Sequence, residues 1–169
     1  FEYMMLEYRV LDDPSYKDKA PEDVRQAAQA IRDFVRTGKK LPDHFDMVHA
    51  YAAAKAYAGM TIAEFDAYVK AYGEKQANGF KGMTYGKSFY QPMIEVFDYL
   101  KANGFTVYVV SGSDRFICRA LVESIGIAPN RVIGMDVKFE TNKQGETAGV
   151  DYTMNKDEYL VRTDQLIIK

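Results

Sequence analysis

The stretch FTVYVVSGS, residues 105–113, decides the fold that this sequence predicts. Its first six residues are all β-branched or aromatic, which is the composition of a strand buried on both faces of a parallel sheet. The stretch ends in Ser111, Gly112 and Ser113, whose small side chains let a ligand approach the backbone closely. We therefore expect a buried strand over residues 105–110, followed directly by a polar turn.

Apolar residues recur at helical spacing on both sides of this strand. Those before it are Met93, Val96, Phe97 and Leu100, and those after it are Ile117, Ala120, Leu121 and Ile125. Gly104 and Gly126 stand where the C-terminal caps of these two helices belong. The order helix, strand, polar turn, helix is the crossover unit of an α/β fold, with a crevice at the carboxyl end of the strand.

The chemistry of the turn favours an anion, most readily a phosphate. The Ser111 hydroxyl, the backbone N–H groups of Gly112 and Ser113 and the N-terminus of the next helix are all suitable donors. A plain strand-to-helix turn, in which Ser113 only caps the next helix, explains the same residues equally well. Both interpretations stay open on the turn alone.

Two basic residues are further candidates for binding a phosphate. Arg115 lies in the first turn of the predicted helix, where a positive side chain is mildly unfavourable, so a role in binding an anion and a plain surface position both remain open. Lys87 lies in a glycine-containing linker, residues 80–89, just before the predicted α/β region. Its alternative is an exposed linker lysine.

Residues 88–134, with YQPM at 90–93 and NGFTVYVVSGS at 103–113, resemble the second conserved motif of haloacid dehalogenase-like phosphatases. The resemblance is closest to the phosphoserine-phosphatase-like branch. It implies a Rossmann-like parallel-sheet core. It also implies that Ser111 is the catalytic hydroxyl that holds the transferring phosphoryl group, with the Gly112 and Ser113 backbone beside it.

The same resemblance implies a phosphomonoester hydrolase with a small-molecule phosphate ester as substrate, a Mg²⁺ cofactor and an aspartyl-phosphate intermediate. The Asp-x-Asp-x-Thr sequence of the family's nucleophile does not occur in the 169 residues, and the acidic fourth motif is not assigned either. No metal ligand is therefore assigned. Lys169 either precedes the third-motif lysine or is that lysine. We expect an interior portion of a longer enzyme, inactive by itself.

Two other classes of protein stay open. One is a non-catalytic module, or pseudoenzyme, that binds phosphoryl ligands through Ser111 without a nucleophile. The other is a dinucleotide-binding domain of the Rossmann type, which the turn after Val110 disfavours because it lacks the spaced glycines of that fingerprint.

The first half of the chain shows helical patterns throughout, and we predict a helical cap subdomain over residues 1–79 and part of the α/β core over residues 80–169. In the resembling phosphatases such a cap closes over the site and selects the substrate. The helical spacing predicts that Val35, Val48 and Ile62 face the protein interior. For Tyr51 it leaves two interpretations open, a place in the core and a place in the lining of a substrate pocket.

A second strand is expected over residues 131–135, followed by an antiparallel excursion in which apolar and polar residues alternate from Val137 onward. Asp136 lies between the two. Whether it reaches the crevice stays open on the sequence.

The composition limits the remaining classes. A formal net charge of −2 gives no reason to expect a nucleic acid or an anionic membrane as partner. The apolar stretches are too short to span a bilayer, and the compartment, cytoplasmic or exported, stays open together with the oligomeric state. A single cysteine, Cys118, excludes an internal disulfide. His44 and His49 are five positions apart, which disfavours a shared zinc site on one helix face.

Overall fold

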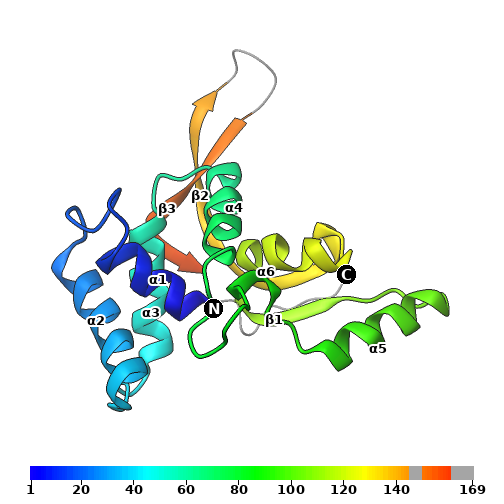
Figure 1. Cartoon of the computed structure of the whole chain (residues 1–169). Coiled ribbons are helices and arrows are strands. Elements are labelled where there is room, and N and C mark those ends of the chain that lie inside the picture. Colours follow the sequence, from blue (N-terminus) through cyan, green and yellow to red (C-terminus); the bar gives the residue numbers. More distant parts are fainter. Residues whose placement is uncertain (145–149, 161–169) are drawn as a thin grey trace. The chain divides into compact units, whose positions relative to one another are not determined.

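A computed structural model describes residues 1–144 and 150–160, and is drawn in Figure 1. Its contacts divide the described chain into two compact units. The first unit comprises Phe1–Ile62 with Val137–Leu160, and the second comprises Ala63–Asp136. The sequence placed a boundary at residue 79, whereas the structure assigns residues 63–79 to the second unit. Identifying these units with a cap and a core stays a prediction.

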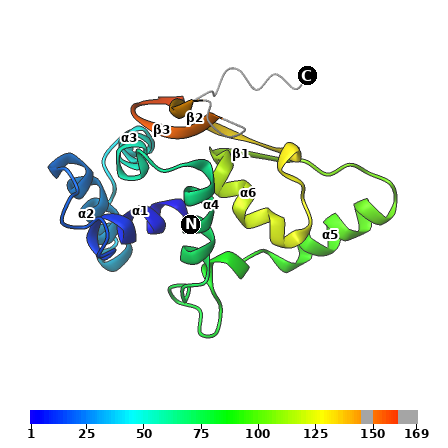
Figure 2. The same cartoon turned by 90° about the horizontal axis from the view of Figure 1, so that it is seen from above.

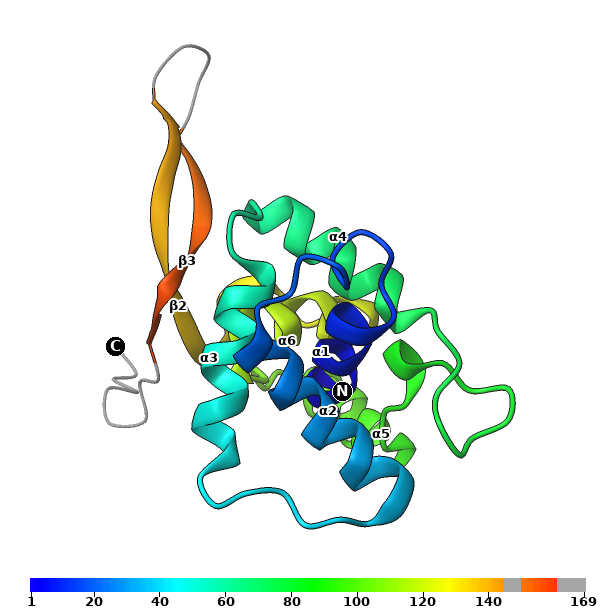
Figure 3. The same ribbon diagram turned by 90° about the vertical axis from the view of Figure 1, so that its left-hand side faces the viewer.

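The first unit is built on three helices, which Figure 3 shows side by side: α1 (Glu2–Leu11), α2 (Glu22–Thr37) and α3 (Phe45–Tyr57). These helices confirm the helical reading of the first half of the chain. Side chains of α1 and α2 are fully buried between them, among them Met5, Leu6, Val10, Val24 and Ile31. Gly38 ends α2 in the left-handed conformation at φ 73°, which a glycine adopts without strain.

Three of the predicted inward-facing residues are exposed instead, and so is Tyr51. The exposed fractions are 44% for Val35 and Val48, 50% for Tyr51 and 39% for Ile62. The buried positions of α3 differ from those predicted: they are Ala50, Ala52, Ala54 and Ala56, together with Phe45, His49 and Tyr57.

The second unit holds most of the α/β pattern. Its helices are α4 (Ile62–Gly73, whose first residue lies in the first unit), α5 (Gln91–Ala102) and α6 (Arg115–Val122), with the short 3₁₀ helices η1 (Tyr85–Lys87), η2 (Glu123–Ile125) and η3 (Pro129–Arg131). Its strands are β1 (Val109–Asp114) and the beginning of β2 (Val132–Gln144). The helix α6 packs beside β1, as Figure 2 shows.

Strands β1 and β2 are parallel, so α5, β1, α6 and β2 form the predicted crossover unit. The sheet has the order β1-β2-β3, where β3 (Val150–Leu160) is part of the first unit. Figure 1 draws β2 and β3 in opposite directions, as the alternating sequence after Val137 predicted. The fold is thus a mixed α/β structure with more helix than strand.

Strand β1 differs from the predicted strand over residues 105–110 in position and in burial. It begins at Val109 rather than at residue 105, and it includes the Ser-Gly-Ser segment. The exposed fractions of Phe105, Tyr108 and Val110 are 62%, 55% and 59%. A strand buried on both faces is therefore wrong for the described residues. In the described part of the chain β1 is an edge strand, and only one of its two faces is covered.

That covered face is packed by a small apolar cluster of Val107, Val122, Ile127 and Val132. Phe97 and Leu100 of α5 pack against this cluster as predicted, but Met93 and Val96 are more than 40% exposed. Met93 and Val96 are not part of the contact with the cluster, because only one side of α5 packs against the covered face of β1.

The predicted cap of α5 is confirmed. Gly104 has φ 79°, the Gly104 N–H donates to the Lys101 carbonyl at 3.1 Å, and the Phe105 N–H donates to the Leu100 carbonyl at 3.0 Å. This pair of hydrogen bonds is the Schellman arrangement, which a glycine at the left-handed position permits. It fixes where the chain leaves the helix and enters β1.

Candidate functional site

The Ser-Gly-Ser segment forms an irregularity in the β1–β2 ladder. Val110 lies opposite Ile133, and Asp114 lies opposite Met135. Between these pairs β1 advances by four residues while β2 advances by two, so residues 111–113 bulge out of the regular pairing. A bulge bends its strand and redirects side chains, and bulges are frequent beside active sites. The sequence did not predict this bulge.

Gly134 lies against the bulge and holds it close to β2. A Cβ atom at Gly134 would be 2.7 Å from the Ser113 carbonyl oxygen and 2.9 Å from the Arg115 Cα. Both neighbours are backbone atoms, which cannot turn aside as a flexible side chain can. The absence of a side chain at Gly134 is therefore a condition of this turn geometry.

The two serines of the turn are hydrogen-bonded to each other. The Ser113 N–H donates to the Ser111 Oγ at 3.1 Å, so the Ser111 oxygen acts as an acceptor while its own hydroxyl proton remains able to donate. Gly112 is exposed, and a Cβ placed on it would meet nothing within 4 Å. The space on the Cβ side of Gly112 is thus open, so a ligand can approach the turn from this side.

The N-terminus of α6 is capped by Asp114 and not by Ser113. The Asp114 Oδ1 accepts hydrogen bonds from the Phe116 N–H at 2.7 Å and from the Ile117 N–H at 3.2 Å. Asp114 is only 4% exposed. The expected Ser113 cap is therefore wrong, and the Asp114 carboxylate already accepts from two N–H groups of the helix N-terminus that a phosphate was expected to use. The binding of a phosphate by Ser111 and by the Gly112 and Ser113 backbone stays a prediction.

Arg115, the next residue, pairs with the strand β2. Its Nη2 lies 3.0 Å from the Asp136 Oδ2, and the two side chains are 30% and 25% exposed. The Arg115 Nε is buried and has no hydrogen-bond partner within the described residues. The guanidinium also lies over the Phe116 ring, 4.7 Å from its centroid. The structure therefore brings Arg115 and Asp136 together at the end of the turn.

A second arginine lies near this pair. The Arg119 guanidinium is 5.4 Å from the centroid of the same Phe116 ring, and its Nε donates to the Pro129 carbonyl at 2.9 Å. Burial lowers the pKa of Arg119, and the positive charge of Arg115 lowers it further. The two arginines are thus close enough to interact electrostatically.

Lys87 is not brought to the turn by any described interaction. It is exposed at the end of η1, and no hydrogen bond or ion pair joins it to Ser111 in the described ranges. Its proposed role in binding phosphate stays a prediction.

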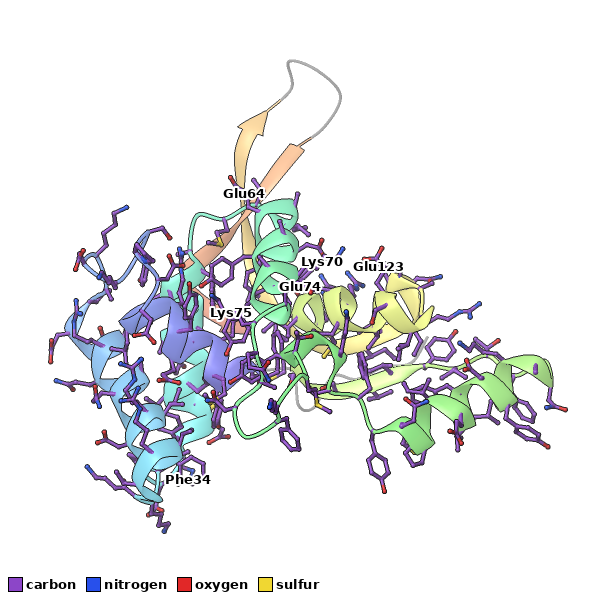
Figure 4. The ribbon with its side chains drawn as sticks, viewed as in Figure 1. Phe34, Glu64, Lys70, Glu74, Lys75 and Glu123 are labelled. Carbon is purple, nitrogen blue, oxygen red and sulfur yellow. The ribbon has the colours of Figure 1, made fainter. Side chains whose placement is uncertain are left out.

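A pocket of about 410 Å³ lies elsewhere in the second unit, between α4 and the end of α6. Its lining residues are Lys70, Gly73, Glu74, Gly86, Ala120, Leu121, Glu123 and Ser124. Figure 4 shows Lys70, Glu74 and Glu123 around this region. The Lys70 Nζ pairs with the Asp66 Oδ2 at 2.8 Å and with the Glu123 Oε2 at 2.5 Å. None of the five predicted site residues lines this pocket.

The described residues offer no group of three or more His, Cys, Asp or Glu side chains that could hold a metal ion. The Asp114 carboxylate caps a helix and the Asp136 carboxylate pairs with Arg115, so both have other roles in the turn. No Mg²⁺ ligand is therefore assigned at the turn, and the ion stays a prediction of the resemblance.

Comparison with known proteins adds no assignment, since no family model and no curated protein matches this chain. In the part of the chain that the structure describes, no helix is both long enough and apolar enough to cross a membrane.

Proposed function

We propose that this chain carries the phosphoryl-binding part of a haloacid dehalogenase-like phosphomonoester hydrolase. The second unit would be part of a Rossmann-like core and the first unit would belong to a helical cap. The observation that carries the proposal is the bulged Ser-Gly-Ser turn at the carboxyl end of β1, followed by α6 and the parallel strand β2. That is the place where open α/β sheets bind their ligands.

The binding of a phosphoryl group would depend on three groups of the turn. The Ser111 hydroxyl donates its proton to a phosphoryl oxygen, and it is oriented because its oxygen accepts from the Ser113 N–H. The backbone at Gly112 is open to solvent, and Arg115 supplies positive charge. Donors held in place before binding stabilise an anion without the cost of reorganising them.

The covalent chemistry lies outside these residues. The family's reaction needs an aspartate nucleophile and Mg²⁺, which neutralises charge on the phosphoryl group when it is bound. The nucleophile sequence does not occur in the 169 residues, and the described residues assign no ligand for the ion. We therefore assign this chain a binding and orienting role.

The second candidate is a non-catalytic module that binds phosphoryl ligands. The observation that favours it is the same missing nucleophile sequence. The two candidates share the Ser111 site and differ in whether Mg²⁺-dependent hydrolysis of an aryl phosphate accompanies binding. Saturable binding with no turnover, in the longest natural protein that contains the sequence, would select the binding module.

The experiment that tests the shared claim is calorimetric titration of inorganic phosphate into the wild-type chain and into a Ser111→Ala variant. A hydrogen bond to a charged group contributes about 1.5–3 kcal/mol, so the variant should bind at least about tenfold more weakly. Ser124→Ala is a matched control, because the Ser124 hydroxyl donates to the Leu121 carbonyl at the C-terminal end of α6, whereas the turn precedes its N-terminus. Equal affinities for wild type and Ser111→Ala would remove Ser111 from the site.

A further inference from the structure

We propose that Asp136 competes with the phosphoryl group for Arg115, so that the Arg115–Asp136 ion pair controls how tightly the turn binds an anion. This inference rests on the proposed function, since it concerns the same turn. It assigns to Asp136 a role in ligand affinity that the resemblance does not supply.

The donors and the positive charge at the turn already have acidic partners. Asp114 occupies the N–H groups of Phe116 and Ile117, so the helix N-terminus is already satisfied by a carboxylate. The positive side chain nearest the turn in sequence is then Arg115, and its charge is compensated by Asp136. An anion that binds here must therefore share or replace the carboxylate that Arg115 already contacts.

The ion pair between Arg115 and Asp136 uses only part of the guanidinium. The ion pair joins one guanidinium nitrogen, Nη2, to one carboxylate oxygen of Asp136 at 3.0 Å. The neighbouring Nε is buried without a partner in the described part of the chain, which is an unfavourable state for an N–H donor. The Nε and Nη2 of an arginine together form the edge that binds two oxygens of one phosphate. A phosphoryl group on that edge would satisfy both donors, whereas the pair with Asp136 satisfies one.

The backbone of β2 determines the position of Asp136. Met135 lies opposite Asp114 in the ladder, and Gly134 contacts the backbone of Ser113 and Arg115. Asp136 follows directly, so its carboxylate is held beside the turn. The two side chains of the pair are 30% and 25% exposed, so the pair is partly accessible to solvent. The Nε is buried, so a phosphoryl group reaches it only when the Asp136 carboxylate moves away.

The charges around Arg115 give the direction of the effect. Arg119 lies over the same Phe116 ring, and the two carboxylates Asp114 and Asp136 act on this arginine together with Arg115. The charges of these two positive and two negative side chains sum to zero. Neutralising Asp136 alone gives the region a net positive charge and leaves the Arg115 guanidinium available to a ligand.

The test is titration of inorganic phosphate into wild type, Asp136→Asn and Asp98→Asn, at one ionic strength. Asp98 is a matched control, because it pairs with Lys101 on α5 at 3.0 Å and its substitution changes the net charge by the same amount. We expect Asp136→Asn to bind phosphate about three- to tenfold more tightly than wild type, and Asp98→Asn to bind as wild type does. In an Arg115→Gln background, Asp136→Asn should give no gain.

The outcomes separate this inference from the proposed function. If neither wild type nor any variant binds phosphate saturably, the proposed function and this inference both fail. If wild type binds and Ser111→Ala weakens binding, but Asp136→Asn binds as wild type or more weakly, only the inference is overturned, and Asp136 is then a structural brace for Arg115. A thermal melt of each variant shows whether a loss of binding reflects unfolding.

Discussion

Replacement of Gly134 by alanine is the sharpest perturbation of the turn. The added Cβ would be 2.7 Å from the Ser113 carbonyl oxygen, 2.9 Å from the Arg115 Cα and 3.0 Å from the Arg115 N. An ordinary carbon–oxygen contact is about 3.3 Å, so the backbone of the bulge must move by roughly 0.6 Å. The contact atoms are all backbone, so no side-chain rotation relieves them.

The magnitude follows from the cost of overpacking. Forcing an extra carbon into a well-packed place costs about 1–3 kcal/mol. For a chain of this length, about 1 kcal/mol corresponds to a shift of about 2–4 °C in the melting temperature. We therefore expect Gly134→Ala to melt several degrees below wild type and to bind inorganic phosphate several-fold more weakly, because the displaced atoms belong to the turn itself.

The assay is a thermal melt followed by circular dichroism, combined with the phosphate titration on folded protein. Gly112→Ala is the matched control, because a Cβ at Gly112 meets nothing within 4 Å. That control should melt at or slightly above the wild-type temperature, since alanine restricts the unfolded chain more than glycine does. If Gly134→Ala melts with wild type, the close contact between β2 and the turn is refuted.

Two further predictions concern buried polar groups. Asp114→Ala should lower the free energy of unfolding by about 1 kcal/mol, because it leaves the N–H groups of Phe116 and Ile117 without their cap. Asp114→Asn should retain most of the wild-type stability, since asparagine also caps helices. Equal urea midpoints for wild type and Asp114→Ala would contradict this prediction. Burial lowers the pKa of His49 from its ordinary 6.5 to about 4. The unfolded chain therefore takes up this proton first, so the free energy of unfolding should fall by up to about 3 kcal/mol as the pH drops from 6.5 towards 4. In urea titrations at several pH values, the free energy of unfolding of His49→Phe should fall less over this range than that of wild type. The same dependence on pH in both proteins would contradict the assignment.

Local signals in the sequence predicted the helices α5 and α6 and the glycines that follow them. Glycines in the left-handed conformation end α5 and the segment after α6, and their positions were readable because few other residues adopt φ near +75°. The apolar spacing likewise located α6, with Ile117 and Ala120 buried. Such features depend on neighbouring residues alone.

Features that depend on distant residues were not predictable in the same way. The composition of residues 105–110 indicates a strand but does not say how many of its faces are covered, and Phe105 and Val110 are exposed. The pairing of Arg115 with Asp136 spans two elements, so the sequence left the position of Asp136 open. The signal that could have identified the bulge is Gly134, since a glycine inside a strand often marks a close backbone approach.

The position of the candidate site in the chain was predicted in part. Ser111, Gly112 and Ser113 lie at the carboxyl end of β1, shortly before α6, but as an irregular part of the strand and not as a turn after it. The helix N-terminus was expected to serve a phosphate, but the preference of aspartate for the N-cap position gives those donors to Asp114. Lys87 stays a prediction, because no described contact links it to the turn.

The central claim, that the turn binds a phosphoryl group, is tested most directly by amide chemical shifts during titration with inorganic phosphate. Chloride at matched ionic strength is the control for general salt effects. The account predicts saturable shifts that are largest at Gly112 and its neighbours and are lost in Ser111→Ala. Shifts that follow ionic strength equally with both salts, or that are spread over the lysines of the surface, would contradict it.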